Sequence, residues 1–359
     1  MSIRQRVEAL ALRLVLALPR WLQRLLAGRP VVRDGQTLAV DTQLALRLQR
    51  LTRKPGAETL PVPEGRRAIL EHALLTAGRQ PIGTVRDLVV AGRPARLYVP
   101  SAAFAARGHA RSAGPLLLFF HGGGFMYGDL DSHDAPCRFL AERSGVRVLA
   151  VDYRLAPEHP FPAAYDDALA AHRWLVDHAA EVGADPARLA VGGDSAGSNL
   201  AALVAIEAAR AGLPLAFQLL VYPATDAVRD TASASLFAEG FYLTRDFMDL
   251  ANQLYVAGTD PRDPRVSPLY AELPAGLAPA YVVTAGFDPL RDEGEAYAHR
   301  LAEEGVDVEL RRFPDQIHGF FNIVGVGRSS RGANAAIAAR LRAALGAGAV
   351  GRSGHDLSA

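Results

Sequence analysis

The feature that most constrains this chain is a short apolar run that leads through a G-x-S-x-G turn straight into a helical pattern. The run covers residues 188–191, the turn residues 193–197 and the Ala- and Leu-rich helical pattern residues 199–210. Such a sharp strand-to-helix turn needs glycines at its crowded positions and lifts the central side chain, Ser195, clear of the sheet. It also places Ser195 at a helix N-terminus, where free N–H groups favour a negative charge. The pattern favours Ser195 as a nucleophile; a simple helix cap is the alternative.

A glycine-rich loop follows an earlier strand pattern. Residues 115–120 are continuously apolar, as expected of a parallel strand covered on both faces, and the sequence HGGG follows at 121–124. Three glycines here suit a loop whose backbone N–H groups face a cavity, whereas a plain flexible turn is the alternative. We expect the amides of Gly122 and Gly123, together with that of Ala196, to form an oxyanion hole.

A serine nucleophile needs a neighbouring base. Three histidines follow Ser195 in the chain, His299, His318 and His355. His318 comes after the strand predicted over 307–313, at the end of the strand from which a loop can reach a site. His299 lies in a helical pattern and His355 in a tail that contains glycine and serine. We therefore expect His318 to be the base.

The base in turn needs an acid to hold it. Asp288 follows the strand predicted over 280–285, at the same sheet edge as the serine and the base, and we assign it this role. Three rival carboxylates have simpler explanations. Two fit the first turn of the next helix, and the third lies too close in sequence to the base. These rivals are Asp292, Glu293 and Asp315.

Four motifs in this order resemble the hormone-sensitive-lipase-type family of α/β-hydrolases, and within it the bacterial carboxylesterases. They are HGGG at 121–124, GDSAG at 193–197, DPL at 288–290 and HGF at 318–320. The resemblance covers about residues 80–345. It implies an α/β-hydrolase fold and a serine carboxylesterase that acts on short- to medium-chain acyl esters through an acyl-enzyme, with no cofactor and no metal. Amide hydrolysis, interfacial lipase action and a non-catalytic ligand receptor of the same fold are the alternatives.

The pattern of residues 81–346 predicts an α/β catalytic domain, with a mainly parallel central sheet flanked by helices. A hairpin is expected first, and further strands then alternate with helices. The expected strands are 85–90, 95–99, 116–120, 146–151, 189–191, 217–222, 281–284 and 308–313. Residues 347–359 are expected to be a disordered tail.

Residues 222–267 interrupt this alternation and are expected to form a second cap insertion. Its apolar side chains Phe237, Tyr242 and Leu243 are our candidates for walls of a substrate pocket. Ordinary packing between cap and core is the alternative.

Residues 1–80 predict an N-terminal helical cap, because apolar residues recur at i, i+3, i+4 spacing within 7–18 and again within 44–51. The first 54 residues carry eleven basic side chains against three acidic ones. We favour a cap that covers the site, with its arginines in solvent. A basic amphipathic surface that touches an anionic membrane is the alternative.

Composition narrows the classes of function and partner that remain. The net charge of +1 gives no sign of nucleic-acid binding, so the expected partner is a small-molecule ester. Cys137 is the single cysteine, which excludes an internal disulfide. No apolar run reaches the ~18–20 residues that span a bilayer. We expect a cytoplasmic protein; its oligomeric state stays open.

Overall fold

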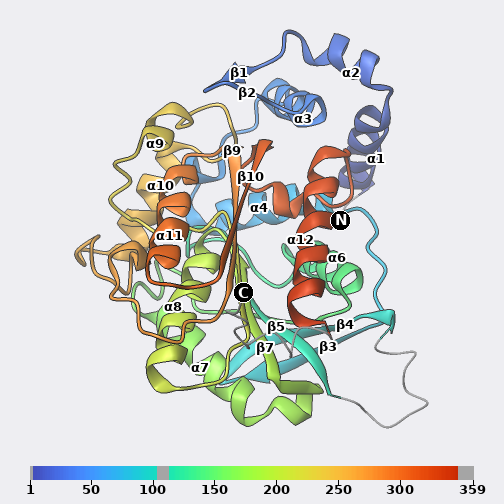
Figure 1. The fold of residues 1–359 in the computed structure, drawn as a ribbon. Helices are drawn as coiled ribbons and strands as arrows, with labels where there is room; N and C mark the ends of the chain where they lie inside the picture. Colours follow the sequence, from blue (N-terminus) through green and yellow to red (C-terminus); the bar gives the residue numbers. More distant parts are fainter. Residues whose placement is uncertain (1–2, 103–112, 347–359) are drawn as a thin grey trace, which may run out of the picture.

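The computed structural model describes residues 3–102 and 113–346 of the 359-residue chain (Figure 1). Within these residues the centre is a sheet of eight strands, which in chain order are β3 (Thr84–Val90), β4 (Arg93–Val99), β5 (Gly114–Phe120), β6 (Arg147–Val151), β7 (Ala184–Asp194), β8 (Phe217–Val221), β9 (Ala280–Phe287) and β10 (Val308–Ile317). The strands lie side by side in the order β10-β9-β8-β7-β5-β6-β4-β3. The expected hairpin β3–β4 is antiparallel and joins β6 antiparallel, while the six strands from β5 to β10 are parallel to one another. This confirms the predicted fold class.

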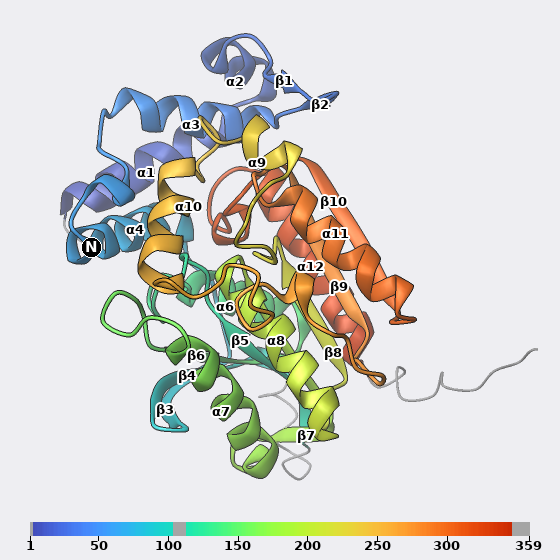
Figure 2. The same ribbon diagram turned by 90° about the vertical axis from the view of Figure 1, so that its left-hand side faces the viewer.

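The middle strands are buried on both faces because helices cover both sides of the sheet. β8 and β9 are buried along their whole length, in keeping with their mainly apolar sequences. One face packs against α7 (Ala163–Asp177), α8 (Ala196–Ala211) and α11 (Arg291–Glu303). The other face packs against α6 (Asp134–Ser144) and α12 (Ser329–Leu345) (Figures 1 and 2). The parallel direction of β5 to β10 brings their carboxyl ends to one edge, where loops from distant parts of the chain meet.

Residues 222–267, which we expected to form a second cap insertion, lie in the segment between β8 and β9. It contains α9 (Ala232–Leu236), α10 (Arg245–Ala251), the π-helical turn η4 (Asn252–Val256) and the 3₁₀ turn η5 (Pro268–Tyr270). Figure 2 shows α9 and α10 beside the N-terminal helices. Two hydrogen bonds tie these regions together, from Thr244 Oγ1 to Glu58 and from Arg50 to the carbonyl of Gly240. Two further 3₁₀ turns, η3 (Ala179–Val182) and η6 (Phe320–Asn322), lie outside this segment.

The N-terminal segment consists mainly of helices and includes a two-stranded hairpin that the sequence did not suggest. Its elements are α1 (Ile3–Ala17), α2 (Arg20–Ala27), β1 (Val32–Arg33), β2 (Gln36–Thr37), α3 (Val40–Leu51), η1 (Ala57–Thr59) and α4 (Val62–Ala77). In both views α1 and α2 lie at the periphery of the molecule (Figures 1 and 2). No helix of the described residues is both long enough and apolar enough to cross a membrane.

The periodicity in α1 does not mark its buried side. Leu12, Val15 and Leu16 pack against α3, with Leu16 only 2% exposed. In contrast, Val7, Leu10 and Leu14, which share the predicted apolar stripe, are 61%, 54% and 62% exposed. The apolar periodicity of α1 therefore does not identify its buried side, because α1 carries apolar residues on two sides. The tail predicted at 347–359 lies outside the described residues.

Candidate active site

Ser195 lies on the turn between β7 and α8, in a backbone conformation that few L-residues adopt. Its φ and ψ are 55° and −120°, and its N–H donates to the carbonyl of Val221. Such a strained conformation persists only where its surroundings hold it. The glycine at 197 is required here, because a Cβ there would overlap the carbonyl oxygen of Phe120 at the end of β5. The close packing of β5 under the turn thus fixes the serine at the rim of the sheet.

The serine, the histidine and the aspartate expected from the sequence are hydrogen-bonded in series. The distance from His318 Nε2 to Ser195 Oγ is 3.0 Å, and that from His318 Nδ1 to Asp288 Oδ2 is 2.8 Å. His318 comes directly after β10 and Asp288 directly after β9, and both are buried. The second oxygen of Asp288 accepts the N–H of Leu290 at 2.8 Å, which fixes the carboxylate. In this arrangement His318 can take a proton from Ser195 while Asp288 holds the imidazole tautomer.

The rival residues make other contacts. Asp292 accepts hydrogen bonds from Arg291 and from the N–H of Ser233. Glu293 accepts the N–H groups of Thr225 and Asp226. His299 is exposed on α11, and Asp315 accepts from Gln316. His355 lies outside the described residues.

The expected oxyanion donors need one correction. The N–H of Gly122 donates to Asp194 Oδ1 at 2.8 Å, so it is not free to bind a substrate oxygen. Among the described residues, the amides of Gly123, Gly124 and Ala196 donate no hydrogen bond. Gly123 and Gly124 have φ values of 122° and 62°, which turn the loop back at this point. The three free amides are therefore those of Gly123, Gly124 and Ala196.

Asp194 joins the glycine loop to the sheet. This carboxylate is 2% exposed, lies 3.2 Å from His133 Nε2, and accepts the hydroxyl of Tyr222 at 3.2 Å. Burial alone would raise the pKa of Asp194, but the neighbouring His133 and the N–H of Gly122 outweigh it and lower the pKa. The carboxylate is therefore ionised near neutral pH and holds Gly122 through a charge-assisted bond.

His121, at the head of the loop, is a structural histidine. It is buried, its ring stacks on Tyr153 with 4.3 Å between centroids, and its Nδ1 lies 2.8 Å from the carbonyl oxygen of Gly122. Burial, with His133 close by, lowers the pKa of His121 to about 4. The ring is consequently neutral near pH 7 and braces the loop.

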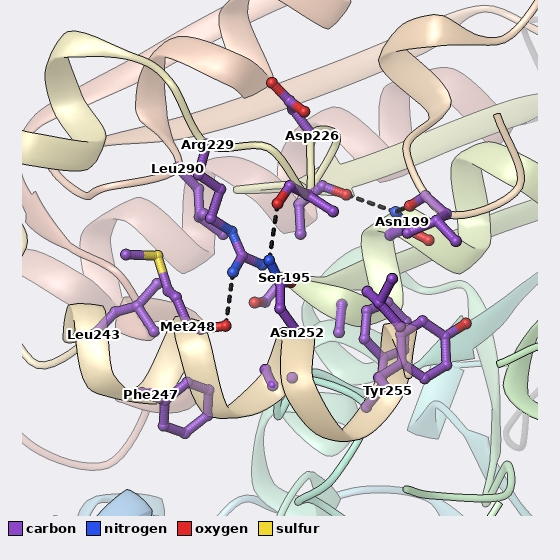
Figure 3. Close-up of a pocket in the computed structure, with 18 residues that line it drawn as sticks. Ser195, Asn199, Asp226, Arg229, Leu243, Phe247, Met248, Asn252, Tyr255 and Leu290 are labelled. Carbon is purple, nitrogen blue, oxygen red and sulfur yellow. Dashed lines mark hydrogen bonds between the residues drawn. The ribbon is translucent and has the colours of Figure 1, made fainter. Parts of the chain in front are cut away.

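Two cavities meet at Ser195. The larger has a volume of about 270 Å³ and reaches from His318 and the glycine loop to residues of α3, η1 and α4, including Leu46, Glu58 and His72. The smaller has a volume of about 30 Å³ and is shown in Figure 3. Leu243, Phe247, Met248 and Leu290 line it together with polar groups, among them Arg229, Asp226 and Asn252. Both cavities are bordered by Gly124, Leu243 and Phe247 as well as by Ser195.

Of the three predicted pocket residues, Tyr242 and Leu243 line the larger cavity, and Leu243 also lines the smaller one. Phe237 lines neither. It is fully buried, with its ring 5.6 Å from the rings of both Phe241 and Phe287. For Phe237 the expectation was wrong, because this side chain packs the insertion onto the end of β9.

Sequence reasoning missed three residues at the site. Gly124 was not among the expected donors, since three glycines in a row do not show which amides are already bonded. Phe247 lines both cavities, but nothing in its surroundings in the sequence separates it from other apolar residues of the insertion. Asp194 belongs to the GDSAG motif, but nothing in the sequence shows that it bonds to the glycine loop 72 residues away. In the part of the chain that the structure describes, no group of three or more His, Cys, Asp or Glu side chains is placed to hold a metal ion.

Comparison with known proteins agrees with this geometry. The α/β hydrolase fold family matches residues 117–322. The chain is 45% identical over 335 residues to the carboxylic ester hydrolase LipN of Mycobacterium tuberculosis, covering 89% of this chain and 86% of LipN. It is 40% identical over 274 residues to an ethyl acetate hydrolase of Pseudomonas putida, covering 74% and 84%.

Solved structures show the same likeness. The α/β hydrolase LAE6 from the metagenome of Lake Arreo, a Ser161Ala mutant, superimposes with a TM-score of 0.80 at 43% identity, covering 86% of this chain and 99% of LAE6. The hyperthermophilic esterase of Pyrobaculum calidifontis gives a TM-score of 0.78 at 36% identity, with 85% and 98% covered. This chain therefore belongs to the α/β hydrolase fold family, in the hormone-sensitive-lipase-type group of carboxylesterases that its four motifs resemble.

Proposed function

We propose that this protein is a serine carboxylesterase with Ser195 as nucleophile, His318 as general base and acid, and Asp288 as the group that orients His318. The observation that carries the proposal is the series of two short hydrogen bonds from Asp288 through His318 to Ser195. The names of the relatives, a carboxylic ester hydrolase and an ethyl acetate hydrolase, support the same reaction class.

The reaction proceeds in two stages. The oxygen of Ser195 bonds to the ester carbonyl carbon while its proton passes to His318 Nε2, and a tetrahedral oxyanion forms. When this intermediate collapses, the bond to the alcohol oxygen breaks and His318 returns the proton to that oxygen. Water then repeats the sequence on the acyl-enzyme, so the products are an acid and an alcohol.

The oxyanion is stabilised by the amides of Gly123, Gly124 and Ala196. These groups are free of other partners among the described residues, and they border the cavities at Ser195. The amide of Ala196 also begins helix α8, where the helix dipole favours negative charge. Losing one donor of this kind costs about 3–4 kcal/mol of transition-state stabilisation.

The substrate is a small-molecule ester with a short- to medium-chain acyl group. The smaller cavity, of about 30 Å³, favours the short end of that range if it takes the acyl group, because it is far smaller than the ~150 Å³ cavity that holds benzene. The larger cavity, of about 270 Å³, then receives the alcohol part, and a cavity of ~150 Å³ already holds benzene.

Residues 1–80 and 222–267 serve as two parts of a cap over this site. Supporting this role, α3, η1 and α4 contribute walls of the larger cavity, and α10 contributes Phe247 and Met248 to the smaller one. The catalytic domain then comprises residues 81–346 without the insertion. A cytoplasmic location remains part of this proposal.

The test is a series of p-nitrophenyl esters from acetate to palmitate, with Ser195→Ala and His318→Ala beside the parent protein. Both variants should lose activity by at least about a thousandfold while keeping the far-ultraviolet circular dichroism spectrum. His299→Ala, an exposed histidine on α11, is the matched control and should keep full activity. An alkyl phosphonate should label Ser195 alone.

Other outcomes would change the assignment. Near-normal turnover by Ser195→Ala, or a phosphonate label on another residue, would refute it. Preference for amides over esters would indicate an amidase, and preference for palmitate emulsions an interfacial lipase. Ligand binding without hydrolysis of any ester would indicate a receptor, a role that the intact His318–Ser195 hydrogen bond disfavours.

A further inference from the structure

Helix α1 carries more apolar surface than the fold uses. Its inner side, with Leu12, Val15 and Leu16, packs against α3. Its outer side carries Ile3, Val7, Leu10 and Leu14, which are 83%, 61%, 54% and 62% exposed. Their spacing of i, i+4, i+7 and i+11 places them in one row along the helix. A row of four large apolar side chains in solvent is not needed for folding, and such patches mark sites of interaction.

Helix α2 also carries exposed apolar side chains. Trp21 and Leu25, one helical turn apart, are 68% and 72% exposed, while Gln23 and Ala27 are turned inward and buried. We name six of the exposed apolar side chains of α1 and α2 the N-terminal apolar face. It consists of Ile3, Val7, Leu10, Leu14, Trp21 and Leu25.

Arginines border this face. At 100° per residue, Arg6 and Arg13 fall on one flank of the α1 row and Arg4 on the other, and Arg20 and Arg24 precede Trp21 and Leu25 by one position each. Arg4 is paired with Glu8. Arg6, Arg13, Arg20 and Arg24 form no ion pair with any residue in the described part of the chain. The border of the face is therefore positively charged.

We propose that the N-terminal apolar face binds the surface of a membrane that contains anionic lipids. An amphipathic helix with large apolar side chains on one side and arginines along the border lies in the plane of the lipid headgroups. The apolar side chains enter the acyl boundary, while the long arginines reach the phosphates. An exposed tryptophan suits the same depth, since its ring is apolar and its N–H can be hydrated.

A second copy of the chain fits this face less well. Two copies that paired through it symmetrically would bring the same unpaired arginines together from both sides. Like charges brought together at an interface oppose association, whereas a surface of anionic phosphates neutralises them. Charge complementarity thus favours the lipid surface.

The position of the face gives membrane binding a consequence for the site. α1 packs on α3, and α3 contributes Leu46, Gln49 and Arg50 to the wall of the larger cavity. Helix α3 is therefore the layer that separates α1 from the Ser195 cavity. Membrane attachment would hold the enzyme where apolar esters partition. The binding itself does not depend on the proposed esterase activity.

The experiment is flotation of the whole protein with phosphatidylcholine vesicles, with and without phosphatidylglycerol, at low and high salt. The parent protein should float with the vesicles that contain phosphatidylglycerol. Less of it should float at high salt, because salt screens the attraction between the arginines and the lipid phosphates. Leu10→Asp combined with Leu14→Asp should reduce the floating fraction by about tenfold or more. Both substitutions are on exposed positions, so hydrolysis of dissolved p-nitrophenyl butyrate should be unchanged.

Val89→Asp is the matched control, since Val89 on β3 is 64% exposed and carries the same kind of change outside the face. It should float like the parent protein. The proposal is overturned if the parent binds neither kind of vesicle, or if the double variant and the parent float equally. It is also overturned if the face drives self-association, seen as a dimer that the double variant abolishes, without vesicle binding. If the parent protein hydrolysed no ester, that result would contradict the proposed function but not the proposed membrane binding.

Discussion

Replacing Asp194 with asparagine should reduce turnover although this residue does not touch the reacting atoms. The carboxylate accepts the N–H of Gly122 at 2.8 Å and the hydroxyl of Tyr222 at 3.2 Å, and it lies 3.2 Å from His133. An asparagine has one acceptor oxygen, so one of the two donors loses its partner and His133 loses an anion. Hydrogen bonds to charged groups contribute about 1.5–3 kcal/mol each, so we expect Asp194→Asn to lower the free energy of unfolding by about 2–4 kcal/mol.

The kinetic effect follows from the position of the loop. Gly122 precedes Gly123 and Gly124, so movement of Gly122 shifts two proposed oxyanion donors. Removing one such donor costs about 10²–10³ in kcat. The loop keeps another restraint, because the carbonyl of Gly123 accepts the N–H of Tyr127 at 2.9 Å. We therefore expect kcat to fall between about tenfold and a hundredfold, with KM within about twofold, because the loss is specific to the transition state.

The assay is steady-state hydrolysis of p-nitrophenyl butyrate together with urea unfolding. Asp167→Asn is the matched control, since Asp167 is also buried and pairs with Arg154 at 2.7 Å, away from the loop. It should lose similar stability and keep its kcat. A folded Asp194→Asn protein with normal kcat would refute the reasoning, and so would an equal loss of kcat in Asp167→Asn.

Three further predictions concern stability and acyl-chain preference. Burial raises the pKa of Glu293 from 4.5 to about 8. Between these two pH values the folded protein keeps a proton that the unfolded chain releases. The free energy of unfolding should therefore fall by at most about 5 kcal/mol as the pH rises from 4.5 to about 8. In Glu293→Gln this fall should be absent from urea unfolding curves measured between about pH 5 and 8; an unchanged slope would contradict the assigned pKa. Leu243→Ala should widen both cavities and move the ester preference toward longer acyl chains. Phe237→Ala should lower the free energy of unfolding by about 3–5 kcal/mol and leave the ester preference unchanged. A shift in that preference would indicate that Phe237 does line a substrate cavity.

The parts of the site that the sequence predicted are those tied to the ends of strands. Ser195, Asp288 and His318 each follow an apolar run, and parallel strands bring their carboxyl ends to one edge. Their convergence was thus a consequence of topology, which the alternation of strands and helices already implied. The order of the motifs along the chain then left few choices for the base and the acid.

What the sequence could not predict depends on contacts between segments far apart in the chain. The bond from Gly122 to Asp194 decides which amides stay free, and it joins two strands that only the folded sheet places side by side. The sequence around Phe237 resembles that around the residues that line the cavities. Only its packing on Phe287 shows that Phe237 is not one of them. In α1, apolar residues on two sides give a periodicity that does not say which side faces α3.

The place of β10 at the rim of the sheet has a consequence for biosynthesis. Among the strands that the structure describes, β10 pairs with β9 alone, and its last residue leads straight to His318, 123 residues after Ser195. Until the ribosome has released this strand and it has aligned beside β9, the serine has no group to remove its proton. A nascent or truncated chain that lacks β10 therefore carries an inert hydroxyl, and the enzyme gains hydrolytic power only once β10 has been made and has paired with β9.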